Sequence, residues 1–387
     1  MRIGIVCYPT FGGSGVVATE LGLALARKGH VVHFITYDRP VRMGERTPNV
    51  FYHEVRVSDY PLFDYQPYEL VLTSKMVDVV KYERLDVLHV HYAIPHASAA
   101  YMAQRILESQ GIHIPFITTL HGTDITLLGK DPSFEPVITF AMDRSNALTA
   151  VSESLRRDTV MHFPLKKMIH TIPNFIKLGR YQGRQDAELR ARFAPNGEKL
   201  MVHVSNFRPV KRVEDVYRVF LEVRRTLPVR LLFVGDGPER QRIEVLCRQE
   251  SVCNEVSFLG KMTRPEDVVA NCDLFLLTSE TESFGLAALE AMACGVPAVS
   301  SDSGGTPEVN IHGVTGLLSP VGDVEDMAKN ALSILSDDAV LARYREGATR
   351  EAARYDVEVI LPRYEALYED VIEQQVAAVR KAHGVHQ

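Results

Sequence analysis

The turn at residues 278–285 has the residue types that bind a phosphate group. The apolar run at residues 273–278 predicts a buried parallel strand, and residues 286–292 predict a helix that starts directly after the turn. Backbone N–H groups at the start of a helix have no partner inside it, and the helix dipole adds partial positive charge there. The amides of residues 283–285 are therefore a candidate anion site beyond the carboxyl end of a strand.

Two glutamates frame this turn. Glu282 precedes the helix, and Glu290 lies inside it, about two turns further along at 3.6 residues per turn. Two acids that faced a phosphate would weaken its binding, so the pair makes chemical sense if both accept hydrogen bonds from sugar hydroxyls. The alternative interpretation is that Glu282 is a charge at a helix N-terminus and Glu290 a solvated surface residue.

The composition is that of a soluble globular protein with two domains. A chain of 387 residues is too long for one ordinary core and predicts two domains of about 150 to 200 residues. No segment has the run of about 18 uncharged apolar residues that crosses a bilayer, and the chain opens on a strand pattern rather than a signal peptide. Five cysteines without metal-ligand spacing indicate reduced thiols and a cytoplasmic protein. At a net charge of −6, no nucleic acid partner is expected.

The first half of the chain predicts a doubly wound α/β domain. A strand at residues 2–7 is followed by the loop Gly12-Gly-Ser-Gly15 and by a helix from Val16 to Lys28. The loop does not have the G-x-G-x-x-G pattern of dinucleotide-binding folds. Gly13 would let the backbone approach a ligand closely, whereas a tight turn without a ligand is the alternative. Further strands are expected at residues 31–36, 51–57, 87–92, 115–120 and 147–151.

Histidine-rich segments follow two of these strands. His89 and His91 share one face of a strand, but no third ligand at metal spacing accompanies them, so we predict no metal site. Tyr92, Thr119 and His121 come at strand ends, where doubly wound sheets bind ligands. They are candidate ligand-binding residues, and buried polar groups with satisfied hydrogen bonds are the alternative.

A second strand-helix series follows a polar linker. Residues 1–175 are assigned to the first domain, residues 176–198 to the linker and residues 199–357 to the second domain. Arg208 and Lys211 lie in a loop after the first strand of this domain and could neutralise a diphosphate. A last helix at about 358–381 is expected to pack back on the first domain. The strands expected in the second domain lie at residues 199–205, 231–235, 256–259, 273–278 and 297–300.

The motifs resemble those of the retaining GT-B glycosyltransferases of family 4. In the second half the resemblance rests on the E-x7-E element from Glu282 to Glu290 and on the segments Val234-Gly-Asp-Gly-Pro-Glu239 and Gly304-Gly-Thr-Pro-Glu308. Within family 4 the chain is similar to the N-acetyl-α-D-glucosaminyl L-malate synthases of bacillithiol biosynthesis. The segments that carry this similarity are Gly12-Gly-Ser-Gly-Val16, His91-Tyr-Ala-Ile-Pro-His-Ala97, Thr118-Thr-Leu-His-Gly-Thr-Asp-Ile-Thr126 and Val204-Ser-Asn-Phe-Arg-Pro-Val-Lys-Arg212.

This resemblance implies a fold and a donor site. The fold would be α/β, with two Rossmann-like, doubly wound parallel-sheet domains facing a central cleft. The donor UDP-N-acetylglucosamine would bind mainly to the second domain, with Glu290 on the ribose, Arg208 and Lys211 on the diphosphate, and Glu282 on a sugar hydroxyl. Many relatives place arginine where Asn206 stands, so Arg208 is expected to supply that second cation. The other implied donor contacts are Gly13, Asn206, Ser283, Phe284 and Gly285.

The acceptor would be L-malate, bound to the first domain. His121 would reach the sugar near its reacting carbon and, with Lys211, Arg208 and Glu282, would form the catalytic group. Lysine plus arginine and aspartate plus glutamate are equal in number over residues 1–172, so no basic face marks where the malate carboxylates bind. The implied acceptor residues are Gly13, Ser14, Tyr92, Thr119 and Asn174.

The resemblance also implies transfer with retention at the anomeric carbon. No D-x-D element that could hold a divalent cation is present, so we expect no metal cofactor, and cationic side chains and the helix terminus would stabilise the departing UDP. Two alternatives stay open: another small polar acceptor such as inositol phosphate, and a UDP-sugar epimerase. Neither a membrane nor a nucleic acid partner is expected, and a homo-oligomer is compatible with the sequence.

Overall fold

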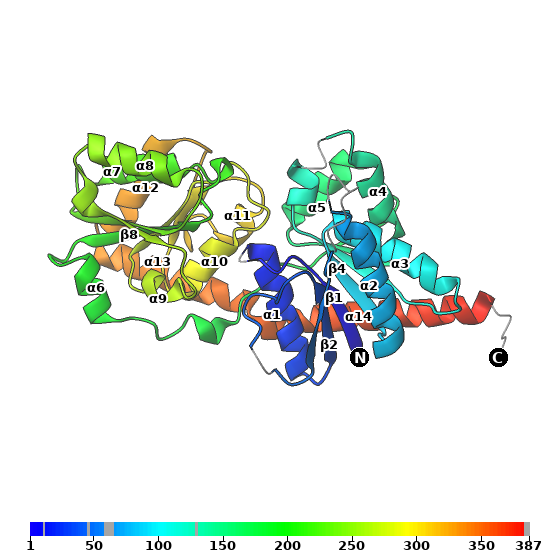
Figure 1. Ribbon diagram of the computed structural model, residues 1–387. Helices are drawn as coiled ribbons and strands as arrows, with labels where there is room; N and C mark the ends of the chain where they lie inside the picture. Colours follow the sequence, from blue (N-terminus) through cyan, green and yellow to red (C-terminus); the bar gives the residue numbers. More distant parts are fainter. Residues whose placement is uncertain (11, 45–46, 58–65, 128–130, 383–387) are drawn as a thin grey trace. The chain divides into compact units, whose positions relative to one another are not determined.

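The computed structural model describes the chain apart from residues 11, 45–46, 58–65, 128–130 and 383–387. The chain divides into two compact units. The first consists of Met1–Asn174 with Val357–Gln387, and the second of Phe175–Asp356. Each unit is built on one all-parallel sheet connected through helices (Figure 1). The predicted pair of Rossmann-like domains is confirmed.

The first unit has a seven-stranded sheet in the order β3-β2-β1-β4-β5-β6-β7. The order of strands reverses between β1 and β4, and doubly wound sheets bind ligands outside the carboxyl ends of the strands at such a reversal. The predicted strands are all present, whereas β7 was missed, since three residues with two polar side chains show no apolar run. The strands are β1 (Arg2–Val6), β2 (Val31–Thr36), β3 (Val50–Glu54), β4 (Val87–His91), β5 (Phe116–Leu120), β6 (Ala147–Ala150) and β7 (Ile169–Thr171).

The first helix of this unit begins earlier than predicted. It starts at Gly13 rather than Val16, so Gly13 and Ser14 lie in its first turn. A Cβ atom on Gly15 would lie 2.5 Å from the carbonyl oxygen of Thr10, so this strand-to-helix turn requires glycine. The helices of the unit are α1 (Gly13–Arg27), α2 (Tyr68–Glu83), α3 (Ser98–Glu108), α4 (Glu135–Arg144), α5 (Glu153–His162) and α14 (Val357–Ala382).

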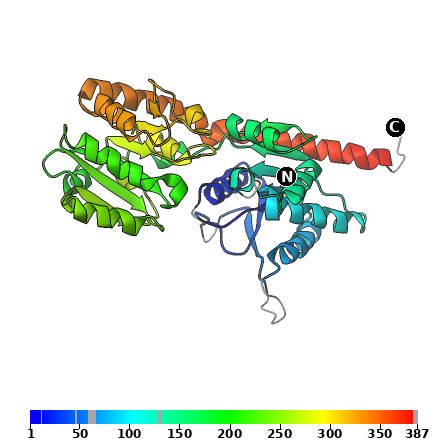
Figure 2. The same cartoon turned by 90° about the horizontal axis from the view of Figure 1, so that it is seen from above.

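The C-terminal helix α14 packs on the first unit, to which the chain returns at its end. Figures 1 and 2 show it, in red, running along this unit. His30 Nε2 lies 2.9 Å from Glu365 Oε1, and the buried Tyr368 hydroxyl lies 2.7 Å from His89 Nδ1. The helix therefore closes the interior of the unit, with Tyr368 as its polar anchor.

Removing this anchor should destabilise the fold. Tyr368→Phe leaves a buried nitrogen of His89 without its partner, and we expect the free energy of unfolding to fall by about 1 to 3 kcal/mol. Urea unfolding followed by circular dichroism measures the change. The matched control is Tyr101→Phe, which removes a hydroxyl for which the structure describes no hydrogen bond. Equal stability of the two variants would contradict this role.

The second unit has a six-stranded sheet in the order β10-β9-β8-β11-β12-β13. Its strand order reverses between β8 and β11, and the loops after these two strands carry the predicted donor residues. The last strand was missed because it starts with glycine and ends with serine. The strands are β8 (Lys199–Ser205), β9 (Val229–Gly235), β10 (Val256–Gly260), β11 (Leu274–Leu277), β12 (Ala298–Ser301) and β13 (Gly316–Ser319).

Apolar faces of several helices form the core of this unit. Val216 and Phe220 from α7 and Met327 from α12 pack in one cluster with Phe233 and Leu276 of the sheet. This packing fixes the strand ends from which the functional loops leave. The helices are α6 (Ala187–Phe193), α7 (Val213–Val223), α8 (Arg240–Gln249), α9 (Glu266–Val269), α10 (Leu286–Ala293), α11 (Thr306–Val309), α12 (Val324–Leu335) and α13 (Asp338–Ala352).

The segment 176–198, expected as a linker, groups with the second unit. Arg190 Nη2 lies 2.8 Å from Asp273 Oδ2, and Arg180 Nε lies 2.8 Å from Glu266 Oε1. These ion pairs involve acids that are almost fully buried. The segment is thus held by specific arginine contacts that its polar composition does not reveal.

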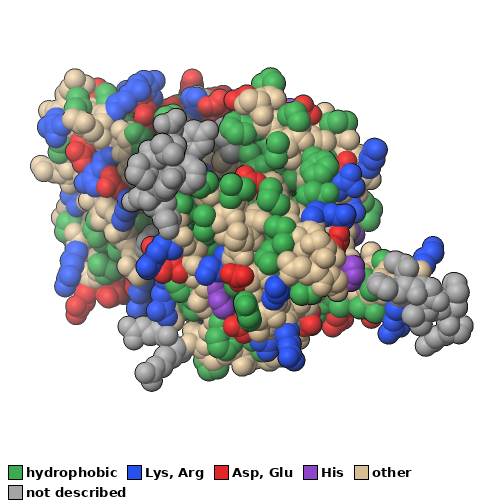
Figure 3. Space-filling model, turned by 45° about the vertical axis from the view of Figure 1, so that its right-hand side comes forward, with side chains coloured by type: hydrophobic (Ala, Val, Ile, Leu, Met, Phe, Trp, Pro, Cys, Tyr) green, Lys and Arg blue, Asp and Glu red, His purple; other side chains and the backbone are tan. Residues whose placement is uncertain are grey.

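Three further properties bear on function. No helix in the described part of the chain has the length and apolar character to cross a membrane. All five cysteines are free thiols, and only Cys253 among them is exposed. Basic and acidic side chains are interspersed over the face drawn in Figure 3, in agreement with the small net charge of −6.

Candidate active site

Two loops of the second unit meet at an ion pair. Lys211 Nζ lies 2.6 Å from Glu282 Oε2, although the two residues are 71 positions apart. The Thr278 hydroxyl donates to the Lys211 carbonyl over 2.9 Å, and the Glu280 N–H donates to the Val210 carbonyl over 2.8 Å. The loops after β8 and β11 thus form one surface, which brings two of the predicted catalytic residues together.

The predicted anion-binding turn rests on a pair of glycines. A Cβ atom on Gly304 would lie 2.0 Å from the Glu282 carbonyl oxygen, and one on Gly305 would lie 2.4 Å from that of Ser283. Phe284 is buried and packs edge-to-face on Tyr355. Within the described residues, no hydrogen bond comes from the backbone N–H groups of Ser283, Phe284 or Gly285. The turn is therefore packed closely against Gly304 and Gly305. The N–H groups of residues 283–285 have no hydrogen-bond acceptor within the described residues.

Asn206 and Arg208 lie in the loop that carries Lys211. Both side chains are exposed, and the Arg208 carbonyl accepts a 2.8 Å hydrogen bond from the Lys211 N–H. Arg208 thus begins the short helical turn that Lys211 ends. The structure places the two predicted cations one turn apart in the same loop.

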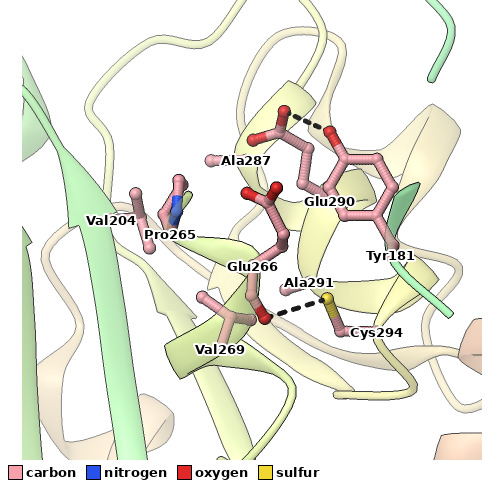
Figure 4. A pocket seen from close by; sticks show the side chains of 9 residues that line it. All are labelled: Tyr181, Val204, Pro265, Glu266, Val269, Ala287, Glu290, Ala291 and Cys294. Carbon is pink, nitrogen blue, oxygen red and sulfur yellow. Dashed lines mark hydrogen bonds between the residues drawn. The ribbon is translucent and has the colours of Figure 1, made fainter. Parts of the chain in front are cut away.

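Glu290 borders a small cavity of about 10 Å³ (Figure 4). The Tyr181 hydroxyl donates to Glu290 Oε1 over 2.7 Å. Glu266 points into the same cavity in Figure 4, and its Oε2 atom is buried with no hydrogen-bond partner among the described residues. Sequence reasoning missed Tyr181 and Glu266, since neither belongs to a motif; an aromatic residue in an otherwise polar segment was the one available signal for Tyr181. The remaining lining residues are Val204, Pro265, Val269, Ala287, Ala291 and Cys294.

The Tyr181 hydroxyl should matter for donor binding. If Glu290 binds the ribose, then Tyr181→Phe removes a hydrogen bond that orients its carboxylate, and KM for the UDP-sugar should rise about fivefold, which corresponds to about 1 kcal/mol. Steady-state kinetics with varied UDP-sugar measure this, with kcat nearly unchanged. Tyr344→Phe, another buried tyrosine of the unit, is the control. An unchanged KM would show that the Tyr181 hydroxyl does not contribute to binding of the UDP-sugar.

In the first unit, Ser14 and Tyr92 meet. The Tyr92 hydroxyl donates to Ser14 Oγ over 2.6 Å, and the Tyr92 N–H donates to the Thr119 carbonyl over 2.9 Å. The Tyr92 backbone adopts φ of 86°, a strained conformation for a residue other than glycine. The His121 ring lies 5.2 Å from the Tyr92 ring. The start of α1 and the ends of β4 and β5 therefore gather Gly13, Ser14, Tyr92 and His121.

The other two predicted acceptor residues lie differently. Thr119 is fully buried, and its hydroxyl lies 2.7 Å from His89 Nε2 and 2.6 Å from Thr149 Oγ1. Its side chain therefore belongs to an internal network, and only its carbonyl contacts Tyr92. Asn174 is almost fully buried, and its Oδ1 atom has no hydrogen-bond partner among the described residues. No described contact joins Asn174 to Ser14 or Tyr92.

Buried histidines form a stack beneath these residues. The rings of His89 and His91 stack at 4.5 Å between centroids, and His91 Nδ1 lies 2.8 Å from His121 Nε2. Burial lowers the pKa of His89 and of His121 to about 3, so both are neutral at physiological pH. Both ring nitrogens of His89 are occupied, by Tyr368 and Thr119.

Asp124 ties together the two loops that carry Tyr92 and His121. Its carboxylate accepts hydrogen bonds from the N–H groups of Ala93, over 2.8 Å, and Gly122, over 3.2 Å. Burial raises the pKa of Asp124 to about 6 against these hydrogen bonds. The aspartate of the Thr118–Thr126 segment thus positions both loops.

One group of described side chains has the composition of a metal site. Potential ligand atoms of His33, His53 and Glu83 lie within 4.8 Å of one another. However, His33 Nδ1 and His53 Nε2 share a 2.9 Å hydrogen bond, and Arg2 Nη2 lies 3.3 Å from Glu83 Oε2. Since the two histidines bond to each other and Glu83 pairs with Arg2 outside the cluster, we assign this cluster a structural role in the first unit.

Family models cover most of the chain. Residues 11–180 match the model described as Glycosyltransferase Family 4, and residues 185–351 match that of Glycosyl transferases group 1. The fold is shared with solved structures. Anabaena HepE in complex with UDP and glucose has a TM-score of 0.77 at 20% identity, covering 95% of this chain and 99% of that one. Sucrose-phosphate synthase from Thermosynechococcus elongatus has a TM-score of 0.78 at 21% identity, covering 97% and 100%.

Curated relatives are similar over nearly the whole length. The N-acetyl-alpha-D-glucosaminyl L-malate synthase of Bacillus anthracis is 46% identical over 375 residues, which is 96% of this chain and 97% of that protein. The D-inositol 3-phosphate glycosyltransferase of Thermobispora bispora is 26% identical, covering 94% and 91%. The chain is a glycosyltransferase of the GT-B fold, and it belongs to the family 4 branch that contains the N-acetyl-alpha-D-glucosaminyl L-malate synthase of Bacillus anthracis.

Proposed function

We propose that this glycosyltransferase moves N-acetylglucosamine from UDP-N-acetylglucosamine to the hydroxyl of L-malate. The products would be N-acetylglucosaminyl malate and UDP, in the first step of bacillithiol biosynthesis. The observation that carries the proposal is the 46% identity to an N-acetyl-alpha-D-glucosaminyl L-malate synthase over 96% of the chain. The Lys211–Glu282 ion pair of the second unit and the Ser14–Tyr92 pair of the first support the proposal, because a diphosphate needs a cation and a polar acceptor needs hydrogen-bonding groups.

The donor is assigned to the second unit. Lys211 and Arg208 would bind the diphosphate, and the amides of residues 283–285 would add uncharged donors at the start of α10. Glu290 would accept hydrogen bonds from the ribose hydroxyls. Glu282 would exchange its bond with Lys211 for one with a sugar hydroxyl, which frees the ammonium group for phosphate.

The acceptor is assigned to the first unit. L-Malate carries two carboxylates, and the first turn of the 15-residue helix α1, which contains Gly13 and Ser14, offers backbone N–H groups to one of them. Tyr92 would exchange its hydrogen bond to Ser14 Oγ for one to the acceptor. Burial raises the pKa of Tyr92 to about 12, so the phenol keeps its proton at neutral pH and remains a donor.

The reaction would retain the anomeric configuration without a metal ion. The malate hydroxyl oxygen forms a bond to the anomeric carbon while the bond from that carbon to the β-phosphate oxygen breaks, and the hydroxyl proton passes to the departing phosphate. Lys211 and the amides of the turn would stabilise the charge that develops on UDP. The expected location of the enzyme is the cytoplasm.

UDP release from UDP-N-acetylglucosamine, with and without L-malate, tests the proposal. We expect release only when malate is present. Inositol phosphate serves as the comparison acceptor, since a relative at 26% identity is named for it. Release with inositol phosphate alone would overturn the malate assignment, and conversion of the donor without any acceptor would indicate an epimerase.

A further inference from the structure

We propose that His91 is a positioning residue that holds the ring proton of His121 on Nδ1. His121 then presents an N–H group that can donate a hydrogen bond to the UDP-sugar. This inference rests on the proposed function for its catalytic consequence. The proton position itself is a property of the free protein and is testable without any substrate.

The two imidazoles are in direct contact. His91 Nδ1 and His121 Nε2 lie 2.8 Å apart, and the ring centroids lie 5.1 Å apart in a stacked arrangement. His91 ends β4, and His121 follows β5, its neighbour in the sheet. Because sheet pairing fixes both backbones, the contact is built into the fold.

Only one proton can lie between the two nitrogens. Burial lowers the pKa of His121 to about 3 and that of His91 well below its usual value, so both rings are neutral at pH 7. A neutral imidazole has one N–H donor and one acceptor nitrogen. Either His91 donates from Nδ1, and His121 keeps its own proton on Nδ1, or His121 donates from Nε2, and His91 keeps its own proton on Nε2.

The surroundings of His91 favour the first arrangement. Its Nε2 atom is buried and has no hydrogen-bond partner among the described residues. In the second arrangement this position would be an N–H group without an acceptor. Among buried backbone groups, orphaned N–H groups are rarer than under-satisfied carbonyl oxygens, and we apply the same preference to this ring nitrogen. In the first arrangement it is a bare acceptor nitrogen.

The chemistry of the substrate agrees with this assignment. Phosphate and sugar ring oxygens are hydrogen-bond acceptors, so a residue that approaches them needs a donor. With Nε2 of His121 occupied by His91, Nδ1 is its remaining ring nitrogen. An N–H group at Nδ1 would stabilise negative charge on the substrate, whereas a lone pair there would repel it.

The ring of His91 is itself held in place. It stacks on His89, which is fixed by hydrogen bonds to Tyr368 and Thr119. The backbone carbonyl of His91 accepts a hydrogen bond from His96 Nδ1. His91 therefore has a fixed backbone and a fixed ring plane, as a residue that orients another imidazole requires.

Nitrogen-15 NMR of the full chain with ring-labelled histidine tests the assignment directly. Long-range proton–nitrogen spectra distinguish an N–H nitrogen from a bare one, and His121→Gln identifies the His121 signals by their loss. We expect the Nδ1-protonated tautomer of His121 in the wild-type protein. A wild-type spectrum with the proton on Nε2 of His121 would overturn the proposal.

Two substitutions of His91 extend the test to catalysis. His91→Leu removes the donor, and we expect mixed His121 tautomers with kcat lowered about 10- to 100-fold, the size typical when a partner that orients a functional histidine is lost. His91→Asn restores an N–H donor near the same position and should regain the wild-type tautomer and come within about fivefold of wild-type kcat. A His91→Leu variant that is folded and keeps the wild-type spectrum would also overturn the proposal.

The matched control is His53→Leu, which breaks another imidazole–imidazole hydrogen bond that the structure describes in this unit. It should lower stability but leave the His121 signals and kcat unchanged. A wild-type protein with the expected tautomer but no transfer to malate would refute the proposed function alone. If the His91→Leu variant showed altered His121 tautomers but kept the wild-type kcat, the catalytic role of the tautomer would be refuted, whereas the tautomer assignment would stand.

Discussion

Lys211→Ala should lower kcat/KM for glycosyl transfer by about 10²- to 10³-fold, the loss expected when one preorganised donor to a developing anion is removed. The structure places Lys211 beside the predicted phosphate-binding turn, with its Nζ atom 2.6 Å from Glu282 Oε2. Its side chain is only 22% exposed, so water screens its charge poorly. The departing UDP would lose its main point charge.

The control for this substitution is Lys199→Ala. Lys199 also forms a 2.6 Å ion pair, with Asp338, but it lies at the start of β8, whereas Lys211 follows the end of that strand. Its partner side chain is 88% exposed, and exposed pairs contribute little. We expect wild-type kinetics for this control. Near wild-type kcat/KM in Lys211→Ala would remove Lys211 from the catalytic group.

Acid should destabilise the protein strongly between pH 6.5 and pH 4. Burial lowers the pKa of His89 and His121 to about 3 and of His96 and His203 to about 4, from 6.5. As the pH falls below 6.5, these histidines bind protons in the unfolded chain but stay neutral in the folded chain, so the free energy of unfolding falls. At pH 5 each such histidine lowers the free energy of unfolding by about 2 kcal/mol, compared with a pH well above 6.5. A typical total stability is about 5 to 15 kcal/mol.

Asp124 acts in the opposite direction. Its pKa is raised from 3.8 to about 6, so the folded chain binds a proton more readily than the unfolded one, and its contribution to stability rises as the pH falls through this range. One carboxyl does not offset four histidines. Urea midpoints at pH 7.5, 6.5, 5.5 and 5.0 measure the net effect. A midpoint that stays constant from pH 7.5 to pH 5.0 would show that these histidines are not buried as described.

Much of the fold follows from local sequence patterns. Apolar runs bounded by glycine or polar turns are sufficient for β1, β8 and β11, because strands buried on both faces need continuous apolar residues. Strands β7 and β13 escape this rule, since they are three and four residues long and contain polar or glycine positions. Their position is set by pairing with β6 and β12, which no local pattern encodes.

The candidate site was only partly predictable. Glu282 and Lys211 could be named because each lies in a motif. The contact between Ser14 and Tyr92 was not predicted, since it depends on β1 and β4 being neighbours in the sheet. By contrast, both Thr118 and Thr119 are polar, so the alternation along β5 does not tell which way each hydroxyl points. Contacts such as that of Tyr181 with Glu290 depend on a segment whose composition resembles a linker.

The proposed reaction joins N-acetylglucosamine to L-malate. The most direct measurement is proton NMR of the product that the full chain forms from UDP-N-acetylglucosamine and L-malate in the presence of a chelator. We expect one new anomeric signal with the small coupling of an α-linkage, correlated through the glycosidic oxygen to the malate carbon that carried the hydroxyl. Free N-acetylglucosamine, an epimerised donor or a β-linked product would contradict it.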